Sequence, residues 1–256
     1  MRTQHVNKFG VSLAYEEAGA GEPPILLVHG WATDRSVMKP LFEWAQRSRR
    51  TVAVDLRGFG ESDAPEGAYT IESYSDDLAF VASQLGLTRP IIVGHSMGGM
   101  IALDFAGRHQ ASAAIVLEGM ILAPELLDGL RPILTGVRSP DFADVAARVM
   151  SYLCGPRFDP RDRSHLVAVA RSCHQHVLVS AMEGILSFDS ESAANAVTCP
   201  LLYVGTAERY ADIGRLRALC PQAITGQLVG CGHYFPLEVP EQLCPMVARF
   251  IQLNAG

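Results

Sequence analysis

Hydrophobic residues along the chain fall into short apolar runs separated by amphipathic stretches. The runs, rich in Val, Ile and Leu, are Ile25 to Val28, Thr51 to Val54, Ile91 to Val93, Ala114 to Leu117, Leu201 to Val204 and Gly226 to Val229. Strands that are apolar at consecutive positions have both faces covered, as in the centre of a parallel sheet. Between most of them the apolar period changes to three and four residues, which predicts helices. This alternation predicts an α/β fold with a doubly wound, mostly parallel sheet.

Two segments depart from this alternation. At the start of the chain, Gln4 to Asn7 and Ser12 to Ala18 mix β-branched and polar residues around Gly10, which indicates an antiparallel hairpin. Between two strands of the sheet, Pro124 to Val197 shows helical periodicity but no strand pattern. We therefore predict a core formed by residues 1–123 and 198–256, with a helical cap at residues 124–197 inserted at the top of the sheet.

Composition excludes several classes of protein. The 256 residues carry a formal charge of −6 that is spread along the chain, which argues against a nucleic-acid partner. The N-terminus lacks the order of a signal peptide, and no run of eighteen apolar residues occurs, so we expect a cytoplasmic protein without a membrane partner. The six cysteines form no C-x-x-C pair and are expected to be reduced and buried. Oligomeric state is not indicated.

A nucleophile is indicated where the strand Ile91 to Val93 ends. It is followed by G-H-S-M-G-G and then by a helix-forming stretch, Met100 to Arg108. A turn from strand to helix holds the hydroxyl of Ser96 exposed, and only glycines at Gly94 and Gly98 fit so tight a turn. The helix N-terminus also directs backbone N–H groups toward a developing negative charge.

A nucleophilic serine needs a base, and His233 is the best placed of eight histidines. It follows a late strand in a glycine-flanked loop and precedes the final helix, Pro240 to Leu253, so it reaches the same edge of the sheet as Ser96. His174 and His176 are two residues apart and cannot share a helical face as metal ligands usually do. No metal site is therefore predicted. No cofactor is predicted either, because no phosphate-binding glycine motif follows the first central strand.

Four ordered motifs then carry a family resemblance: His29-Gly30-Trp31, Asp55-Leu56-Arg57-Gly58-Phe59-Gly60-Glu61-Ser62, Gly94-His95-Ser96-Met97-Gly98-Gly99 and Gly232-His233. In order and separation the chain resembles the α/β-hydrolase family, apart from the cap. The resemblance implies an oxyanion hole formed by the backbone N–H groups of Trp31 and Met97. It also implies a structural role for Asp55 and Arg57.

The acid of the triad is less determined. Members of this family usually carry it in a G-x-x-D pattern after the strand before the last, and Glu208 stands there in Gly205-Thr206-Ala207-Glu208. Glutamate can replace aspartate, because the role is to orient and stabilise the imidazole. Glu208 is the preferred candidate. Glu118, at the end of the sixth strand, and Asp212, which also suits a helix cap, remain alternatives.

These residues predict a serine hydrolase that cleaves a small carboxylic ester or lactone through an acyl-enzyme. Small or apolar residues of the cap favour an apolar acyl or aryl substrate. They are Ala146, Ala147, Val149, Ala168, Val169, Ala170, Ala181, Met182, Ile185 and Leu186. A carbon–carbon hydrolase of ring-cleavage products, cofactor-free perhydrolysis or haloperoxidation, amide hydrolysis, and a non-catalytic small-molecule receptor remain alternatives. Related carbon–carbon hydrolases resemble G-N-S-M-G-G at the elbow and often carry Trp after the histidine, where this chain has His95 and Tyr234.

Overall fold

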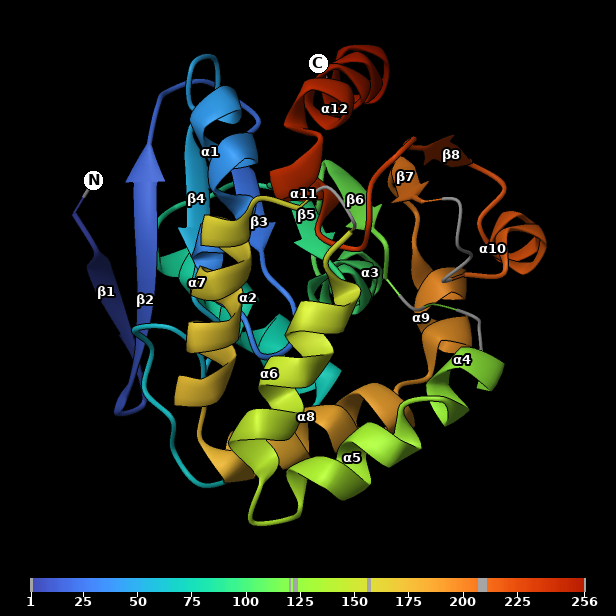
Figure 1. Cartoon of the computed structure of the whole chain (residues 1–256). Helices are drawn as coiled ribbons and strands as arrows, with labels where there is room; N and C mark the ends of the chain where they lie inside the picture. Colours follow the sequence, from blue (N-terminus) through green and yellow to red (C-terminus); the bar gives the residue numbers. More distant parts are fainter. Residues whose placement is uncertain (1, 120, 122–123, 156–157, 207–210, 256) are drawn as a thin grey trace.

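The computed structural model describes residues 2–119, 121, 124–155, 158–206 and 211–255 (Figure 1). Its centre is an eight-stranded sheet in the order β1-β2-β4-β3-β5-β6-β7-β8. The strands are β1 (Gln4–Lys8), β2 (Val11–Ala18), β3 (Ile25–Val28), β4 (Thr51–Val54), β5 (Ile91–His95), β6 (Ala113–Leu117), β7 (Leu201–Gly205) and β8 (Ala223–Gln227). β2 pairs antiparallel with β1 and β4, and the remaining pairs are parallel. The predicted hairpin and mostly parallel sheet are confirmed.

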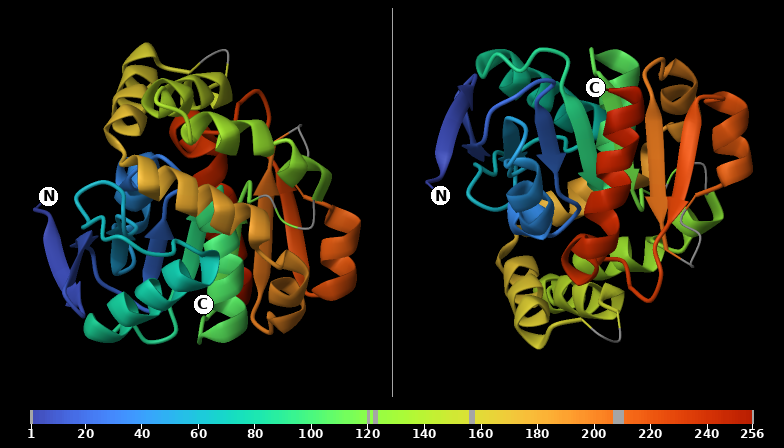
Figure 2. Two further views of the ribbon diagram at one scale, coloured as in Figure 1. Left: turned by 90° about the horizontal axis from the view of Figure 1, so that it is seen from below. Right: turned by 90° about the horizontal axis from the view of Figure 1, so that it is seen from above.

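Helices cover both faces of the sheet. In sequence order the helices outside the inserted segment are η1 (Arg35–Met38), α1 (Lys39–Ala45), α2 (Ile71–Gln84), α3 (Met97–Arg108), α10 (Ile213–Leu219), α11 (Phe235–Glu238) and α12 (Pro240–Asn254). Helices α1 and α12 contact each other on one face, and α2 and α3 contact each other on the opposite face (Figure 2). The central strands β3, β4, β5 and β6 are therefore buried along their whole length, as their apolar runs predict.

The inserted segment is helical throughout its described part. It consists of α4 (Pro124–Asp128), α5 (Arg131–Val137), α6 (Phe142–Leu153), α7 (Pro160–Ser172), α8 (Gln175–Ser187) and α9 (Ser190–Ala196). Helices α5 to α8 lie together beyond one end of the sheet (Figures 1 and 2). The last helix, α9, instead packs against α3 of the core, where Gly107 allows close approach to Ala193 and Ala196. The limits of the cap as a domain stay a prediction.

One predicted strand is displaced. The sequence places the last strand at Gly226 to Val229, whereas β8 ends at Gln227. β8 lies at the edge of the sheet and is partly exposed, with Ile224 45% accessible, so it lacks the continuous apolar run that marks a central strand. The apolar pair beyond it belongs to the loop, in which Val229 is 72% accessible. The shift matters because this loop carries His233.

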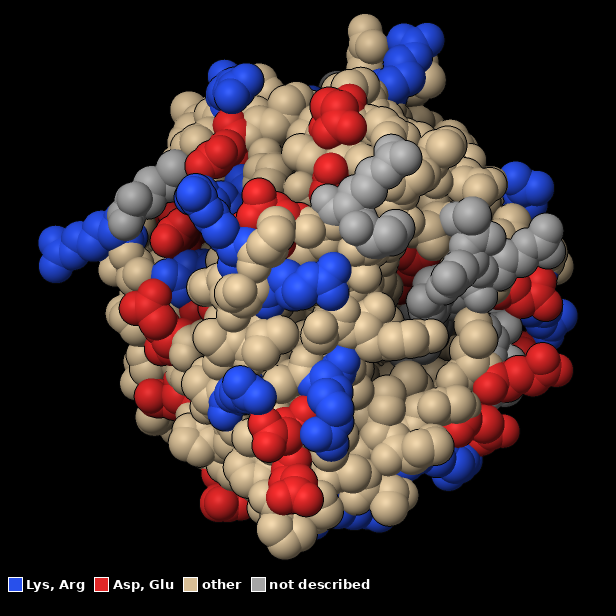
Figure 3. Space-filling model, in the orientation of Figure 1, with Lys and Arg blue, Asp and Glu red and all other residues tan. Residues whose placement is uncertain are grey.

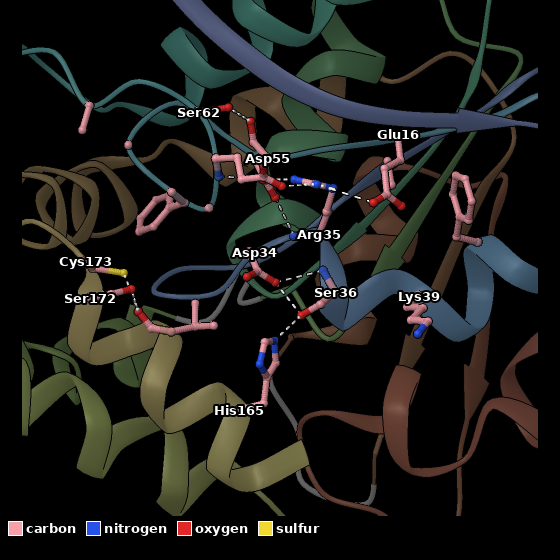
Figure 4. A pocket seen from close by; sticks show the side chains of 18 of the residues that line it. Glu16, Asp34, Arg35, Ser36, Lys39, Asp55, Ser62, His165, Ser172 and Cys173 are labelled. Carbon is pink, nitrogen blue, oxygen red and sulfur yellow. Dashed lines mark hydrogen bonds and ion pairs between the residues drawn. The ribbon is translucent and has the colours of Figure 1, made fainter. Parts of the chain in front are cut away.

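Ion pairs fix the loop that follows β4. The carboxylate of Asp55 is fully buried, accepts hydrogen bonds from the backbone N–H groups of Arg35 and Glu61 at 2.8 Å each, and pairs with the Arg35 guanidinium (Figure 4). Arg57 pairs with buried Asp77 of α2 at 2.7 Å. Both residues therefore have structural partners, in agreement with the sequence interpretation.

Candidate active site

Ser96 lies at the junction of β5 and α3 in a backbone conformation that side chains rarely adopt. Its φ is 58° and its ψ is −120°. Such a conformation costs on the order of 1–3 kcal/mol and persists only where the surroundings enforce it. Two glycines make it sterically possible: a Cβ on Gly94 would lie 1.8 Å from the carbonyl oxygen of Gly98, and one on Gly98 would lie 2.4 Å from that of His29.

The turn after β3 lies directly against Ser96. A Cβ on Gly30 would lie 3.0 Å from the Cβ of Ser96, so the backbone at Gly30 and Trp31 reaches the nucleophile position. Nε2 of buried His29 accepts a hydrogen bond from the Leu56 N–H at 3.0 Å, so its Nδ1 carries the proton and donates to the Gly30 carbonyl at 2.8 Å. Burial lowers the pKa of His29, which keeps the ring neutral. This turn is therefore held rigid from both sides.

Trp31 anchors the same turn to the cap. Its indole Nε1 donates a hydrogen bond to the carbonyl of Leu178 in α8 at 3.0 Å, and only 6% of the residue is accessible. Met97 begins α3, where the first backbone N–H groups of a helix have no partner within the helix. The two residues predicted to form an oxyanion hole thus follow two turns that meet at Ser96. Whether their N–H groups bind an oxyanion stays a prediction.

His233 belongs to the same cavity as Ser96. It is 7% accessible, and its backbone N–H donates to the carbonyl of Leu153, at the end of α6, at 3.2 Å. The residue before it, Gly232, donates its N–H to Glu238. The loop that carries the predicted base is therefore fastened to the cap and to α11. Nearby Cys231 offers no competing nucleophile, because burial raises the pKa of its thiol to about 11.

Glu118 is the described carboxylate that faces this imidazole. Its Oε2 lies 3.7 Å from Nδ1 of His233, and the side chain is fully buried. Its Oε1 accepts hydrogen bonds from the backbone N–H and the Oγ1 of Thr206, at 2.9 and 2.7 Å. The residue follows β6 with a φ of 51°, a conformation that favours glycine in an unconstrained chain. The fold thus holds one carboxylate of the sequence alternatives against the predicted base.

Of the other two acid candidates, the structure describes only Asp212. Glu208, preferred from the sequence, lies outside the described residues, so its assignment stays a prediction. Asp212 is the N-cap of α10, where its Oδ1 accepts a hydrogen bond from the Arg215 N–H at 2.9 Å. This cap supports the structural interpretation of Asp212.

His95 links the elbow to the loop of the base. Its Nε2 lies 2.8 Å from the His233 carbonyl, which can only accept, so Nε2 carries the proton and donates. The two rings have centroids 4.7 Å apart. Burial, followed by the neighbouring His233 ring, lowers the pKa of His95 to about 3, so it is neutral in the folded protein at physiological pH. A histidine at this place therefore positions the loop and carries no charge.

The cavity at Ser96 has a volume of about 500 Å³ and is lined largely by cap residues. Besides Gly30, Trp31, His95, Ser96, His233 and Tyr234, its described lining consists of Leu126, Gly129, Leu130, Ile133, Arg148, Val149, Met150, Tyr152, Leu153, Met182 and Ile185. Of the ten cap residues singled out from the sequence, Val149, Met182 and Ile185 line it, and the other seven are not part of its described lining. Sequence periodicity did not identify Arg148 or Tyr152 as lining residues, since a helical pattern does not show which exposed positions border a cavity.

A second cavity, of about 590 Å³, lies elsewhere. It is bordered by the Arg35–Asp55 pair and by residues of η1 and α7, and neither Ser96 nor His233 lines it (Figure 4). Some of its polar groups are hydrogen-bonded to one another: the Ser36 hydroxyl bonds both Asp34 and His165.

The charges on one face of the molecule are mixed in sign. Acidic and basic side chains are interspersed over the face shown in Figure 3. Within the described ranges, no three His, Cys, Asp or Glu side chains are grouped so as to hold a metal ion. In the same ranges, every helix is too short or too polar to span a bilayer.

The fold, the elbow and the histidine loop together define a hydrolase of the α/β type. The chain belongs to the alpha/beta hydrolase family, whose model matches residues 25–245. This family consists of hydrolases. The eight-stranded sheet of the chain agrees with that of its structural relatives.

Similar proteins differ in the bonds they are named for. The chain is 28% identical to a 2-(acetamidomethylene)succinate hydrolase of Mesorhizobium japonicum, over 94% of this chain and 92% of the relative. It is 37% identical to a 2-hydroxy-6-oxo-2,4-heptadienoate hydrolase of Pseudomonas putida, over 47% of this chain and 46% of the relative. In two of the curated relatives, the matched segment is less than half of the relative's own length, 38% in one and 46% in the other. A thermophilic esterase from Thermogutta terrifontis, solved with malate bound, superposes with a TM-score of 0.84 at 26% identity, covering 98% of both chains.

The neutral state of His95 predicts a pH-dependent stability. Above pH 6.5 the ring is neutral in both the folded and unfolded chains, but at lower pH the unfolded chain binds a proton that the folded protein does not. Stability should therefore fall on acidification. His95→Gln keeps an N–H donor near the position of Nε2 without titrating. Between pH 7.5 and pH 5, urea unfolding should show wild type losing up to about 2 kcal/mol more than this variant. Equal losses would contradict the pKa assignment.

Proposed function

We propose that this protein is a serine hydrolase that cleaves a small carboxylic ester or lactone through an acyl-enzyme intermediate. One observation carries the proposal: Ser96, strained at the N-terminus of α3, and His233 line the same apolar cavity. A serine in this conformation is exposed to substrate, and an adjacent imidazole is the base that activates it.

The chemistry follows from the groups at the cavity. The Oγ of Ser96 attacks the acyl carbonyl carbon while Nε2 of His233 takes the hydroxyl proton, giving a tetrahedral oxyanion. The N–H groups of Trp31 and Met97 stabilise that oxyanion. When the ester bond breaks, the imidazolium returns the proton to the leaving alcohol, and an acyl-Ser96 ester remains. Water then attacks the acyl carbon while His233 takes its proton. The bond from the acyl carbon to Oγ breaks, the imidazolium returns the proton to Ser96, and the carboxylic acid leaves.

The position of Glu118 supports it as the acid of this triad. A carboxylate near Nδ1 stabilises the imidazolium that forms when Nε2 takes a proton, and Glu118 Oε2 lies 3.7 Å away. The contacts with Thr206 hold the carboxylate in that direction. The rival hypothesis places Glu208 in this role, and the variants described below separate the two.

Hydrolysis of a carbon–carbon bond is the second candidate. The name of the Pseudomonas putida relative, which matches part of the chain, supports it. Against it stand His95 and Tyr234, which occupy positions where related carbon–carbon hydrolases resemble G-N-S-M-G-G and carry Trp. Loss of the yellow colour of a dienoate substrate would identify this activity, whereas ester cleavage releases an alcohol and an acid.

Ser96 should be the one residue labelled by a fluorophosphonate probe, because it alone combines a strained, exposed hydroxyl with a neighbouring base. Ser96→Ala should lose the label and lower kcat on p-nitrophenyl esters by about 10⁴-fold to 10⁶-fold. Ser36→Ala, which alters a hydroxyl of the second cavity, is the matched control and should label like wild type. Labelling without turnover of any ester would favour the receptor hypothesis, and labelling that persists in Ser96→Ala would refute the nucleophile.

Glu118→Gln should lower kcat by at least about 100-fold with a smaller change in KM, because it removes the charge that stabilises the His233 imidazolium. Since Glu118 is buried, Thr206→Val serves as the control: it removes a hydrogen bond to the same carboxylate but keeps its charge. Thermal melting should confirm that both variants fold. Near-normal kcat in Glu118→Gln, together with strong loss in Glu208→Gln, would return the acid to Glu208.

Acyl chain length should determine the rate on uncharged esters. Each methylene that enters the apolar cavity gains up to about 0.8 kcal/mol, so kcat/KM should rise a few-fold per carbon and fall when the cavity is full. p-Nitrophenyl esters from acetate to octanoate measure this. Met182→Ala, which enlarges the cavity, should move the optimum to longer chains, whereas a flat profile in both proteins would show that the cavity does not select the acyl group.

A further inference from the structure

One charged side chain stands out in the lining of the Ser96 cavity. Arg148 of α6 is the single Lys, Arg, Asp or Glu among its described lining residues. It has neither a hydrogen bond nor an ion pair among the described residues. Four other arginines of the cap have partners: Arg131 pairs with Asp128, Arg138 with Glu183 and Arg171 with Asp144, and Arg163 donates to two carbonyls. The guanidinium at the cavity is thus available to a ligand.

The surroundings of Arg148 leave its charge uncompensated. On its own helix the acid one turn away, Asp144, is already paired with Arg171 of α7 at 2.9 Å. Helix α5, which also packs against α6, carries no acidic residue. The two histidines that line the cavity, His95 and His233, cannot compensate the charge of Arg148, because an imidazole is either neutral or positive. An anion entering here meets one free cation and no carboxylate on the described walls.

Apolar groups connect this cation to the nucleophile. Arg148 and Tyr152 lie one turn apart on α6, so their side chains are neighbours on one face, and both are exposed at the cavity. Farther along the same helix, the Leu153 carbonyl accepts a hydrogen bond from the His233 N–H at 3.2 Å, and the Met150 sulfur lies 2.7 Å from the Tyr234 hydroxyl, so the apolar residues of α6 adjoin the loop of His233. A molecule that spans the cavity therefore passes from the reacting centre through apolar walls to a guanidinium.

We propose that Arg148 binds a carboxylate at the far end of the substrate, so that the substrate class is an ester or lactone with an apolar body and a distal carboxylate. This inference rests on the proposed serine hydrolase activity and extends it. A guanidinium suits a carboxylate because it donates two parallel hydrogen bonds to it. Arg148 acts here as a specificity residue that touches the substrate but takes no part in bond making or breaking.

Methyl esters in matched pairs test the proposal. The monomethyl esters of dicarboxylic acids from C5 to C8 carry the distal carboxylate, and methyl alkanoates of equal length lack it. In Arg148→Gln the ratio of kcat/KM for the anionic over the neutral ester should fall about fivefold to twentyfold, mainly through KM, a modest range because the guanidinium is exposed.

Two controls separate a specific contact from general charge. Arg161, on α7, is also exposed and unpaired among the described residues, but it does not line the cavity, so Arg161→Gln should keep the wild-type ratio. Arg148→Lys retains the charge without the two-pronged geometry and should fall between wild type and Arg148→Gln. An unchanged ratio in Arg148→Gln, or an equal loss in Arg161→Gln, would overturn the subsite.

Failure of this inference is distinguishable from failure of the proposed function. If wild type hydrolyses neutral esters but Arg148→Gln leaves the ratio unchanged, only the subsite is wrong. If no ester is hydrolysed, calorimetric binding to the Ser96→Ala protein still tests it. 5-Phenylpentanoate should then bind at least about fivefold more tightly than 5-phenylpentanol, with the difference lost on adding Arg148→Gln. Equal binding of the two ligands would refute the subsite.

Discussion

The active site depends on backbone packed directly against backbone. Where β5 passes into α3, the carbonyl of Gly98 occupies the space that a side chain on Gly94 would need, and the carbonyl of His29 does the same for Gly98. Any Cβ at these places would push the helix away from the end of β3. Because none is present, the N-terminus of α3, the strained Ser96 and the Gly30 turn come within contact distance. The positions of Ser96, the proposed nucleophile, and of the proposed oxyanion donors follow from this one steric condition.

Most of the sheet could be predicted from sequence because its strands are buried on both faces. A strand such as β3, fully enclosed, needs a continuous apolar run, and such a run is visible in a single sequence. The edge strand β8 lacks this requirement, and its predicted position was displaced accordingly. The helices described within Pro124 to Val197 could also be expected, because longer ones such as α6 keep an apolar face.

A candidate site residue could be predicted from sequence when a motif lies beside it in the chain. The nucleophile position, Ser96, is marked by glycines within two residues, and the loop of His233 by Gly230 and Gly232. The carboxylate that faces His233 depends on how β6 and β7 lie side by side, because Thr206, beyond one strand, holds Glu118, beyond the other. No motif in the neighbouring sequence marks Arg148. Its importance comes from what surrounds it in space, and nothing in the helical pattern of α6 distinguishes it from a solvated arginine.

The cap meets the catalytic loops through main-chain oxygens. The carbonyl of Leu178 receives the indole of Trp31, and that of Leu153 receives the backbone N–H of His233. Every amino acid supplies a carbonyl, so these two tethers place no demand on which side chains the cap helices carry. Substitutions along α6 and α8 can consequently change the cavity wall while Ser96 and His233 keep their positions. In this scaffold new substrate preferences can arise by ordinary point mutation in the cap, without rebuilding the reaction centre.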